Sequence, residues 1–311
     1  MVNKIKFYNN FKISAVHKHS ILLIGNFDGL HLGHQKLFKL ANNYKKKFNL
    51  KIGVVTFEPM PKMYFNKNIK NFRISNFNQK ARILKSLSID FIIIKKFDKK
   101  FSKIKSHNFI KNILYKNLKA KYIFVSNNFR FGNKREGNVN QLIKNEKKFK
   151  FKVIKTKPLV LKNKLISSTL IRNLLSTGQV EYANQLLARK WSIESKVQKG
   201  RQMGKKIGFP TCNMDIKDYV IPKLGVYAVR IHQKNNRKIL KGIANIGYRP
   251  TFNQKKLLLE VYIFNFLGNL YNKYLTIEFI NFIRKEKKFK NINQLKKQIN
   301  SDLKLVIKKL N

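Results

Sequence analysis

The stretch GNFDGLHLGH, residues 25–34, holds one Asp, three Gly and two His within ten residues. It follows the apolar run ILLI and precedes apolar residues with helical spacing. A glycine-rich turn between a buried strand and a helix presents free backbone N–H groups at the positive end of the helix dipole, which favours anions. His31 and His34 would donate hydrogen bonds to phosphoryl oxygens there and stabilise charge in a transition state. The pattern therefore predicts a cradle for phosphate groups.

This turn has three other interpretations. The two histidines could simply cap a helix in a glycine-rich turn. A zinc site is disfavoured, because histidines three residues apart lack the further His or carboxylate ligands that zinc needs. The chain has no GxxxxGK[ST] segment, which excludes a P-loop. Phosphate binding and helix capping therefore both remain open on these residues alone.

Acidic side chains are scarce in this chain, which has 14 Asp and Glu residues against 68 Lys and Arg. An acid that persists in a glycine-rich or apolar stretch is therefore a good candidate for chemistry. Asp28, Glu58 and Glu260 are of that kind.

The net charge of +54 raises the question of a nucleic-acid partner. Only 11 of the basic residues are Arg and the other 57 are Lys, whereas nucleic-acid sites favour the planar Arg fork. Lys, Asn, Ile and Phe, all abundant here, have codons rich in A and T, which indicates genomic drift. We expect no specific nucleic acid as a partner, and only weak binding at low salt.

The first half of the chain alternates short apolar runs with stretches of helical spacing. The runs begin at Ile21, Ile52, Asp90, Lys121 and Phe151. They are short and show little alternation, as expected of strands buried on both faces. Strand alternating with helix predicts a Rossmann-like α/β domain with a parallel sheet and helices on both faces. Ligands of such sheets bind beyond the carboxyl ends of the strands, where the 25–34 turn would lie.

The second half, after about Ala188, has a different pattern. Five strand-like segments, several of them alternating, are separated at short intervals by Gly, Pro and Asn: WSIESKV, GVYAVRI, KILKGIANIGY, LLLEVYIFNF and YLTIEFINFI. This is typical of a small all-β barrel or sandwich. The tail, NINQLKKQINSDLKLVIKKL, predicts a terminal helix with Leu303 and Val306 on its apolar face. We expect two domains, residues 1–187 and 188–311.

Length and composition bound the class of protein. The 311 residues suit about two domains, and a hydrophobic content of 43% suffices for real cores. Cys212 is the single cysteine, so an internal disulfide is impossible. The N-terminus lacks the apolar run of a signal peptide, and nowhere do about 18 apolar residues follow one another. We expect a cytoplasmic protein that does not enter a membrane; its oligomeric state is not set by the sequence.

At residues 25–35 the chain resembles the HxGH form of the nucleotidylyltransferase signature. The likeness is to the bacterial bifunctional riboflavin kinase/FMN adenylyltransferase family, also called FAD synthetase. It extends through TFEPMP, NFRFGNKREGN and ISSTLIR in order, and the β-rich half is similar through GRQMGKKIGFPTCN, GIANIGYRPTF and FIRKEKKF. The resemblance runs from about residue 20 to the end and implies ATP, riboflavin and FMN as partners, with Mg²⁺ beside ATP.

For adenylylation of FMN, the resemblance implies that His31 and His34 act on the ATP phosphates. It implies further nucleotide contacts from Gly25, Asn26, Asp28, Gly33, Ser167, Ser168, Thr169 and Arg172. It implies flavin contacts from Phe57, Pro59, Asn128 and Arg130. Ser168 and Thr169 could equally be an ordinary helix cap. The family usually has His at Met60, Gly at Ser126 and Asp at Asn128, so either the flavin or adenine contacts are rearranged here or adenylyl transfer is weaker. We expect the transfer to persist.

For phosphorylation of riboflavin, the resemblance implies that Glu260 is the general base, and we expect it to be an acid of the barrel interior. A buried structural ion pair at Glu260 and a base at Glu278 are the alternatives. Thr211 and Asn213 offer oxygens suited to Mg²⁺, a hard cation. The nucleotide loop would contain Gly200, Lys205 and Gly208, unless it is a plain hairpin connection. Other adenylyltransferases of the superfamily lack a β-barrel domain with GFPTCN, so the second half of the chain argues against them.

Overall fold

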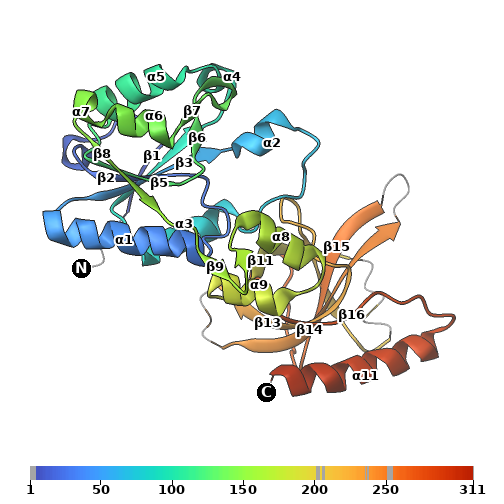
Figure 1. Cartoon of the computed structure of the whole chain (residues 1–311). Coiled ribbons are helices and arrows are strands. Elements are labelled where there is room, and N and C mark those ends of the chain that lie inside the picture. Colours follow the sequence, from blue (N-terminus) through green and yellow to red (C-terminus); the bar gives the residue numbers. More distant parts are fainter. Residues whose placement is uncertain are drawn as a thin grey trace. The chain divides into compact units, whose positions relative to one another are not determined.

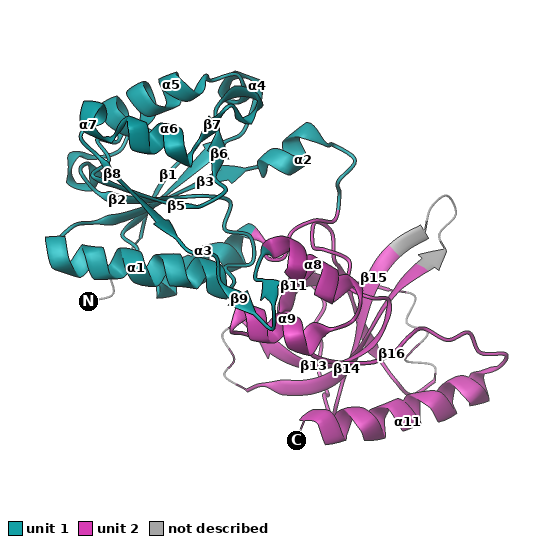
Figure 2. Cartoon of the chain, viewed as in Figure 1, with its two compact units in different colours: residues 1–70, 77–167 teal, residues 71–76, 168–311 magenta. Residues whose placement is uncertain are grey.

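Two units make up the computed structural model of the chain, which describes residues 5–200, 204, 207–234, 236, 238–250 and 255–310. Figure 2 shows them in different colours. The first unit comprises residues 1–70 and 77–167, and the second comprises residues 71–76 and 168–311. Each has its own sheet and its own hydrophobic core.

A six-stranded sheet forms the centre of the first unit (Figure 1). Its order is β1-β4-β3-β2-β5-β8, and every neighbouring pair is parallel. The strands are β1 (Lys6–Tyr8), β2 (Ile21–Ile24), β3 (Ile52–Glu58), β4 (Phe91–Lys96), β5 (Tyr122–Ser126) and β8 (Lys152–Thr156). The five apolar runs supply the five longer strands, so the predicted parallel sheet is confirmed. The edge strand β1 was missed, because three residues are too short to show a pattern.

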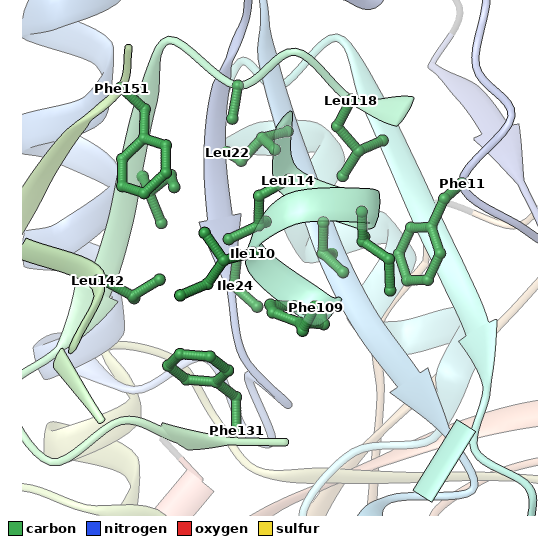
Figure 3. Packing of buried hydrophobic residues seen from close by; sticks show 14 of the residues in the cluster. Phe11, Leu22, Ile24, Phe109, Ile110, Leu114, Leu118, Phe131, Leu142 and Phe151 are labelled. Atoms are coloured by element: carbon green, nitrogen blue, oxygen red, sulfur yellow. The ribbon is translucent and has the colours of Figure 1, made fainter. Parts of the chain in front are cut away.

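Helices cover both faces of this sheet, as predicted. α1 (Leu32–Phe48) and α3 (Phe77–Ser86) pack on the face that carries Ile21 and Leu23. The other face carries Leu22 and Ile24 and packs against η2 (Phe109–Asn117). Figure 3 shows the close packing of this second layer. Because successive side chains of a strand point to opposite faces, four apolar residues of β2 serve both layers.

Short elements complete the first unit. They are η1 (Ala15–His17), α2 (Pro61–Phe65), α4 (Lys99–Ser102), α5 (Ser106–Asn108), β6 (Arg130–Phe131), η3 (Asn133–Arg135), β7 (Gly137–Asn138), α6 (Val139–Lys144), α7 (Glu146–Phe149), β9 (Val160–Leu161) and β10 (Lys164–Leu165). Through α1 the chain passes from β2 to β3 on one side, whereas β5 lies on the other side of β2. The loop after β2 therefore lies where the strand order reverses, which is where open α/β sheets bind ligands.

The second unit is built on a closed antiparallel barrel with the order β11-β12-β15-β14-β13-β16. Its strands are β11 (Ser192–Gln198), β12 (Thr211–Asp215), β13 (Gly225–Gln233), β14 (Leu240–Pro250), β15 (Lys255–Ile263) and β16 (Tyr274–Arg284). The five strand-like segments all form strands, and closure into a barrel is confirmed. The sixth strand, β12, was missed, and it carries Thr211 and Asn213.

The long helices of the second unit, within the residues described, are α8 (Ser168–Ser176), α9 (Val180–Leu187) and α11 (Ile292–Leu310). The predicted terminal helix is thus confirmed. α11 packs on the outside of the barrel, where Val306 and Leu310 join Val226 and Ile243 in one apolar cluster. Asp302 of α11 is 2% exposed and receives hydrogen bonds from Arg284, at 2.7 Å from Nη2.

The segment 71–76 belongs to the second unit although it precedes α3. Arg73 pairs with Tyr219, and the Trp191 indole donates to the Ile74 carbonyl at 2.9 Å. Along the chain, the first unit ends at residue 167 and the second resumes at residue 168. α8 and α9 therefore belong to the unit that contains the barrel. The functional division near residue 187 stays a prediction.

Candidate active sites

The loop after β2 is a tight, buried turn in the first unit. Phe27, Gly29 and Leu30 have φ of 49°, 76° and 42°, so the chain reverses sharply before α1. Asp28 and His31 are each 6% exposed, and the Phe27 ring meets the His34 ring edge-on at 5.3 Å. The turn thus holds its polar side chains against the carboxyl edge of the sheet.

The two histidines of this loop stack at the start of α1. Their ring centroids lie 3.7 Å apart with 21° between the planes. His31 precedes the helix, and its Nδ1 accepts a hydrogen bond from the His34 backbone N–H at 3.4 Å. A Cβ on Gly33 would lie 3.2 Å from the His31 ring, so the glycine leaves room for the stack. His31 does cap the helix, but this bond uses only one of its ring nitrogens.

Two buried polar atoms of the loop have no hydrogen-bond partner within the described part of the chain. They are Asn26 Oδ1 and His34 Nδ1. An unsatisfied buried polar atom costs about 1–3 kcal/mol, so native proteins rarely leave one without a role. Both atoms lie in the loop at the carboxyl edge of the sheet, where open α/β sheets bind their ligands.

The charge state of His34 limits its chemistry. Burial lowers the pKa of His34 well below its ordinary value, and repulsion from His31 lowers it further. The imidazole is therefore neutral at pH 7. It can exchange a hydrogen bond with a phosphate, but the positive charge that a triphosphate requires must come from other groups.

Lys80 was missed by the sequence analysis. It lies on α3, is 4% exposed, and its Nζ donates to the Asn26 carbonyl at 3.3 Å and to Thr56 Oγ1 at 3.2 Å. One lysine among 57 carries no signal in a helical pattern. Only the packing of α3 on the sheet brings it to the loop.

Two further predicted motifs lie at the same edge, at the ends of the strands that flank β2. Phe57 lies near the end of β3, Pro59 and Met60 follow that strand, and Asn128 and Arg130 follow β5. The Phe57 ring is 9% exposed and packs near the rings of Phe97 and Phe101 in the core. Met60 is 3% exposed, whereas Asn128 is exposed and accepts a hydrogen bond from Ser126. The flavin contacts of Phe57, Pro59, Asn128 and Arg130 stay predictions.

The ISSTLIR motif spans both units. Ser167 ends the first unit, and Ser168 and Thr169 begin α8 in the second. The Arg172 guanidinium lies 3.6 Å over the Phe72 ring, and its Nε donates to the Phe72 carbonyl at 2.8 Å. Arg172 is thus held by the 71–76 segment within its own unit. The nucleotide contacts of these four residues stay predictions.

Glu260 lies in a row of polar residues on the barrel. Its register partners are Asn213 on β12 and Asn245 on β14. Directly paired residues of an antiparallel sheet share one face, so the three side chains are neighbours. Asn213 is 8% exposed, and its Oδ1 is buried without a hydrogen-bond partner among the residues described. Asn245 was missed, because strand register cannot be read from one strand alone.

The expectation that Glu260 is an acid of the barrel interior is wrong. Its neighbours Leu259 and Val261 are fully buried and point inward, so Glu260 points outward. The same outer face carries Val226, the register partner of Asn245, which packs in the cluster beneath α11. The apolar residues around Glu260 therefore reflect a strand covered on both sides.

The predicted kinase loop lies against β12. A Cβ on Gly200 would overlap the Asn213 amide, and one on Gly204 would lie 3.4 Å from Thr211 Oγ1. Gly208 has a φ of 89° in the turn that leads into β12. Lys205 lies outside the described residues. Gly200 thus allows the backbone to approach Asn213 closely.

Two other residues of the barrel have surroundings that require no catalytic role. The rival carboxylate Glu278 lies beside the His232 ring, with 3.0 Å between Oε2 and Nε2. Burial raises the pKa of the Cys212 thiol to about 11, so it stays protonated at neutral pH. Glu278 fits a structural contact with His232, and Cys212 fits a small packing residue.

Comparisons with known proteins match one family model to each half of the chain. The model of the FAD synthetase family matches residues 13–170, and that of riboflavin kinase matches residues 187–310. A bifunctional riboflavin kinase/FMN adenylyltransferase of Buchnera aphidicola from Acyrthosiphon pisum is 41% identical over 96% of each chain. Its counterpart in Escherichia coli K12 is 34% identical over 91% of this chain and 90% of its own.

A solved structure has the same fold along the whole chain. It is named a macrolide-efflux protein of Streptococcus pneumoniae, and it covers 96% of this chain and 97% of its own with a TM-score of 0.85 and 28% identity. In the described part of this chain, no helix is both long and apolar enough to cross a bilayer. From the two family matches and the curated relatives, the chain belongs to the bifunctional riboflavin kinase/FMN adenylyltransferase family.

Proposed function

We propose that the chain makes FAD in two steps. Riboflavin is first phosphorylated to FMN on the barrel unit, and FMN is then adenylylated on the sheet unit with release of pyrophosphate. ATP is the donor in both steps. Residues 1–187 would carry adenylyl transfer and residues 188–311 the kinase, in agreement with the two family matches.

The observation that supports adenylyl transfer is the stacked pair of histidines at the start of α1, beside two unpartnered buried polar atoms. FMN brings its own nucleophile, because its phosphate oxygen attacks the α-phosphorus of ATP and pyrophosphate leaves. The protein must therefore position the two reactants and stabilise charge. The loop of Asn26 to His34 and the N-terminus of α1 suit that task.

The observation that supports the kinase is the row of Asn213, Glu260 and Asn245. The terminal hydroxyl of riboflavin must lose its proton as it attacks the γ-phosphorus of ATP, and a carboxylate is a suitable base. Glu260 would accept that proton. Glu278 is less suited, because its carboxylate already lies beside His232.

Mg²⁺ fits the oxygen atoms beside Glu260. Asn213 Oδ1 is buried and unpartnered within the described residues, and Thr211 adds a hydroxyl two residues earlier on β12. Amide and hydroxyl oxygens are hard ligands of the kind that Mg²⁺ prefers. No group of three or more His, Cys, Asp or Glu that could hold a metal occurs among the described residues. When bound, Mg²⁺ would neutralise charge on the ATP phosphates.

The surroundings of the reaction follow from the same reasoning. We place it in the cytoplasm, where ATP is available, without a membrane or a specific nucleic acid as partner. Most of the excess charge comes from Lys rather than Arg, so binding to nucleic acid should vanish at moderate salt, whereas flavin binding should persist.

One experiment tests both reactions. Purified protein is incubated with riboflavin and Mg-ATP, and FMN and FAD are separated over time; a second incubation begins from FMN and measures pyrophosphate. Glu260→Gln should abolish formation of FMN while supplied FMN is still converted to FAD. Loss of both activities in a folded Glu260→Gln protein would refute the assignment of the two reactions to two units.

A further inference from the structure

Lys80 is an exception among the basic residues of this chain. In the part of the chain that the structure describes, it is the only Lys or Arg in the buried class, at 4% exposure. Burying an ammonium group costs several kcal/mol unless the site compensates for it. A chain with 57 Lys has ample surface for such residues, so the placement of this one is informative.

The contacts of Lys80 join three elements of the first unit. From α3, its Nζ donates to Thr56 Oγ1 on β3 at 3.2 Å and to the Asn26 carbonyl after β2 at 3.3 Å. Thr56, 1% exposed, donates from Oγ1 to the same carbonyl at 3.4 Å. The ammonium and the hydroxyl thus converge on one backbone oxygen at the carboxyl edge of the sheet.

The residue held in this way begins the loop of Asn26 to His34, the proposed phosphate loop. Asn26 is followed by Phe27, whose φ of 49° starts the sharp turn toward the stacked histidines. The amide oxygen of Asn26 is buried and has no partner within the described residues. Lys80 therefore fixes the backbone of a residue whose amide oxygen has no partner in the described part of the chain.

The location of this charge also matters for the ligand. Adenylyl transfer develops negative charge on phosphate oxygens, and a fixed cation in a buried site stabilises such charge more than one in water. The neighbouring His34 is neutral at pH 7 and supplies none. A cation fixed beside the Asn26 carbonyl meets this need without any rearrangement during the reaction.

We propose that Lys80 is a positioning residue for adenylyl transfer, which fixes the Asn26 end of the phosphate loop and places a buried positive charge beside it. This role rests on the proposed adenylylation of FMN. It assigns no function to Lys85, the other lysine of α3, which is exposed.

The experiment compares four variants of the full chain: Lys80→Met, Thr56→Val, the double variant, and Lys85→Met as the matched control on the exposed face of α3. Pyrophosphate release from FMN and Mg-ATP gives kcat and KM, and formation of FMN from riboflavin reports on the other unit. Thermal unfolding identifies any variant that does not fold.

We expect Lys80→Met to lower kcat of adenylylation about a hundredfold, because the loop would be displaced and the negative charge of the transition state would lose a nearby cation. KM for FMN and the kinase rate should change less than about twofold, as should both rates of Lys85→Met. Thr56→Val should lower kcat by a smaller factor, and the double variant should be no worse than Lys80→Met, because both act on one carbonyl.

Several results would overturn this role. One is wild-type kcat in Lys80→Met, and another is an equal loss of both activities. Multiplicative effects in the double variant would show that Thr56 and Lys80 act separately. If Lys80→Met does not fold, an unchanged kcat of adenylylation in Thr56→Val would be enough to overturn the role. Wild-type protein that releases no pyrophosphate would overturn the proposed function itself, which is a different outcome.

Discussion

The substitution Gly33→Ala separates stability from activity in the phosphate loop. The added Cβ would lie 3.2 Å from His31 Cε1 and Nδ1, whereas ordinary contacts lie at 3.4–4 Å. The His31 ring must therefore retreat by a few tenths of an ångström from its stack with His34. A misplacement of about 1 Å costs about a hundredfold in rate, so this shift should lower kcat of adenylylation about three- to tenfold.

The same substitution should not weaken the fold. Gly33 lies in the first turn of α1 with no positive φ, and Ala is the better helix former by up to about 1 kcal/mol. We expect unchanged or slightly higher thermal stability, a normal kinase rate, and normal behaviour of Lys36→Ala, an exposed control on α1. A stable Gly33→Ala protein with full adenylylation would refute the claim that the glycine makes room for the stacked ring.

Two further predictions concern stability. The pKa of His34 in the folded protein lies below its unfolded value of about 6.5, so the unfolded state binds the proton more readily and folding stability should fall as pH drops below about 6.5. Between about pH 7.5 and 5.5 the melting temperature should therefore fall less in His34→Asn than in the wild type. Equal slopes would contradict this. Asp302→Ala leaves the Arg284 guanidinium without its buried carboxylate and should lower the free energy of unfolding by about 3 kcal/mol, measured with denaturant. The control Lys304→Ala, on the exposed side of α11, should change it by almost nothing. A decrease under about 1 kcal/mol in Asp302→Ala would show that the pair does not anchor the helix.

Patterns local in the chain were predictable. The order of strands and helices, the parallel sheet, the change to an all-β unit and the terminal helix all follow from apolar periodicity and its interruption by Gly and Pro. The turn between β2 and α1 was equally visible, because its glycines and histidines lie within ten residues. β12 was not, since its residues TCNMD lack an apolar run and become a strand only through pairing with β11 and β15.

Long-range partners were not predictable. Asn245 joins Glu260 only through the register of β14 against β15, and Lys80 reaches Asn26 only because α3 packs on the sheet 54 residues later in the chain. Asp302 interrupts the apolar face of α11 and is buried only because Arg284 of β16 meets it. Apolar periodicity in the sequence does not reveal such long-range contacts.

The orientation of Glu260 shows the division most clearly. By itself the sequence determined that an acid lies within an apolar strand, because residue type and strand pattern are local properties. Tertiary structure decided that this acid points outward beside Asn213 and Asn245. Alternation distinguishes inside from outside only where one face meets water, and β15 is covered by the barrel core on one face and in part by α11 on the other.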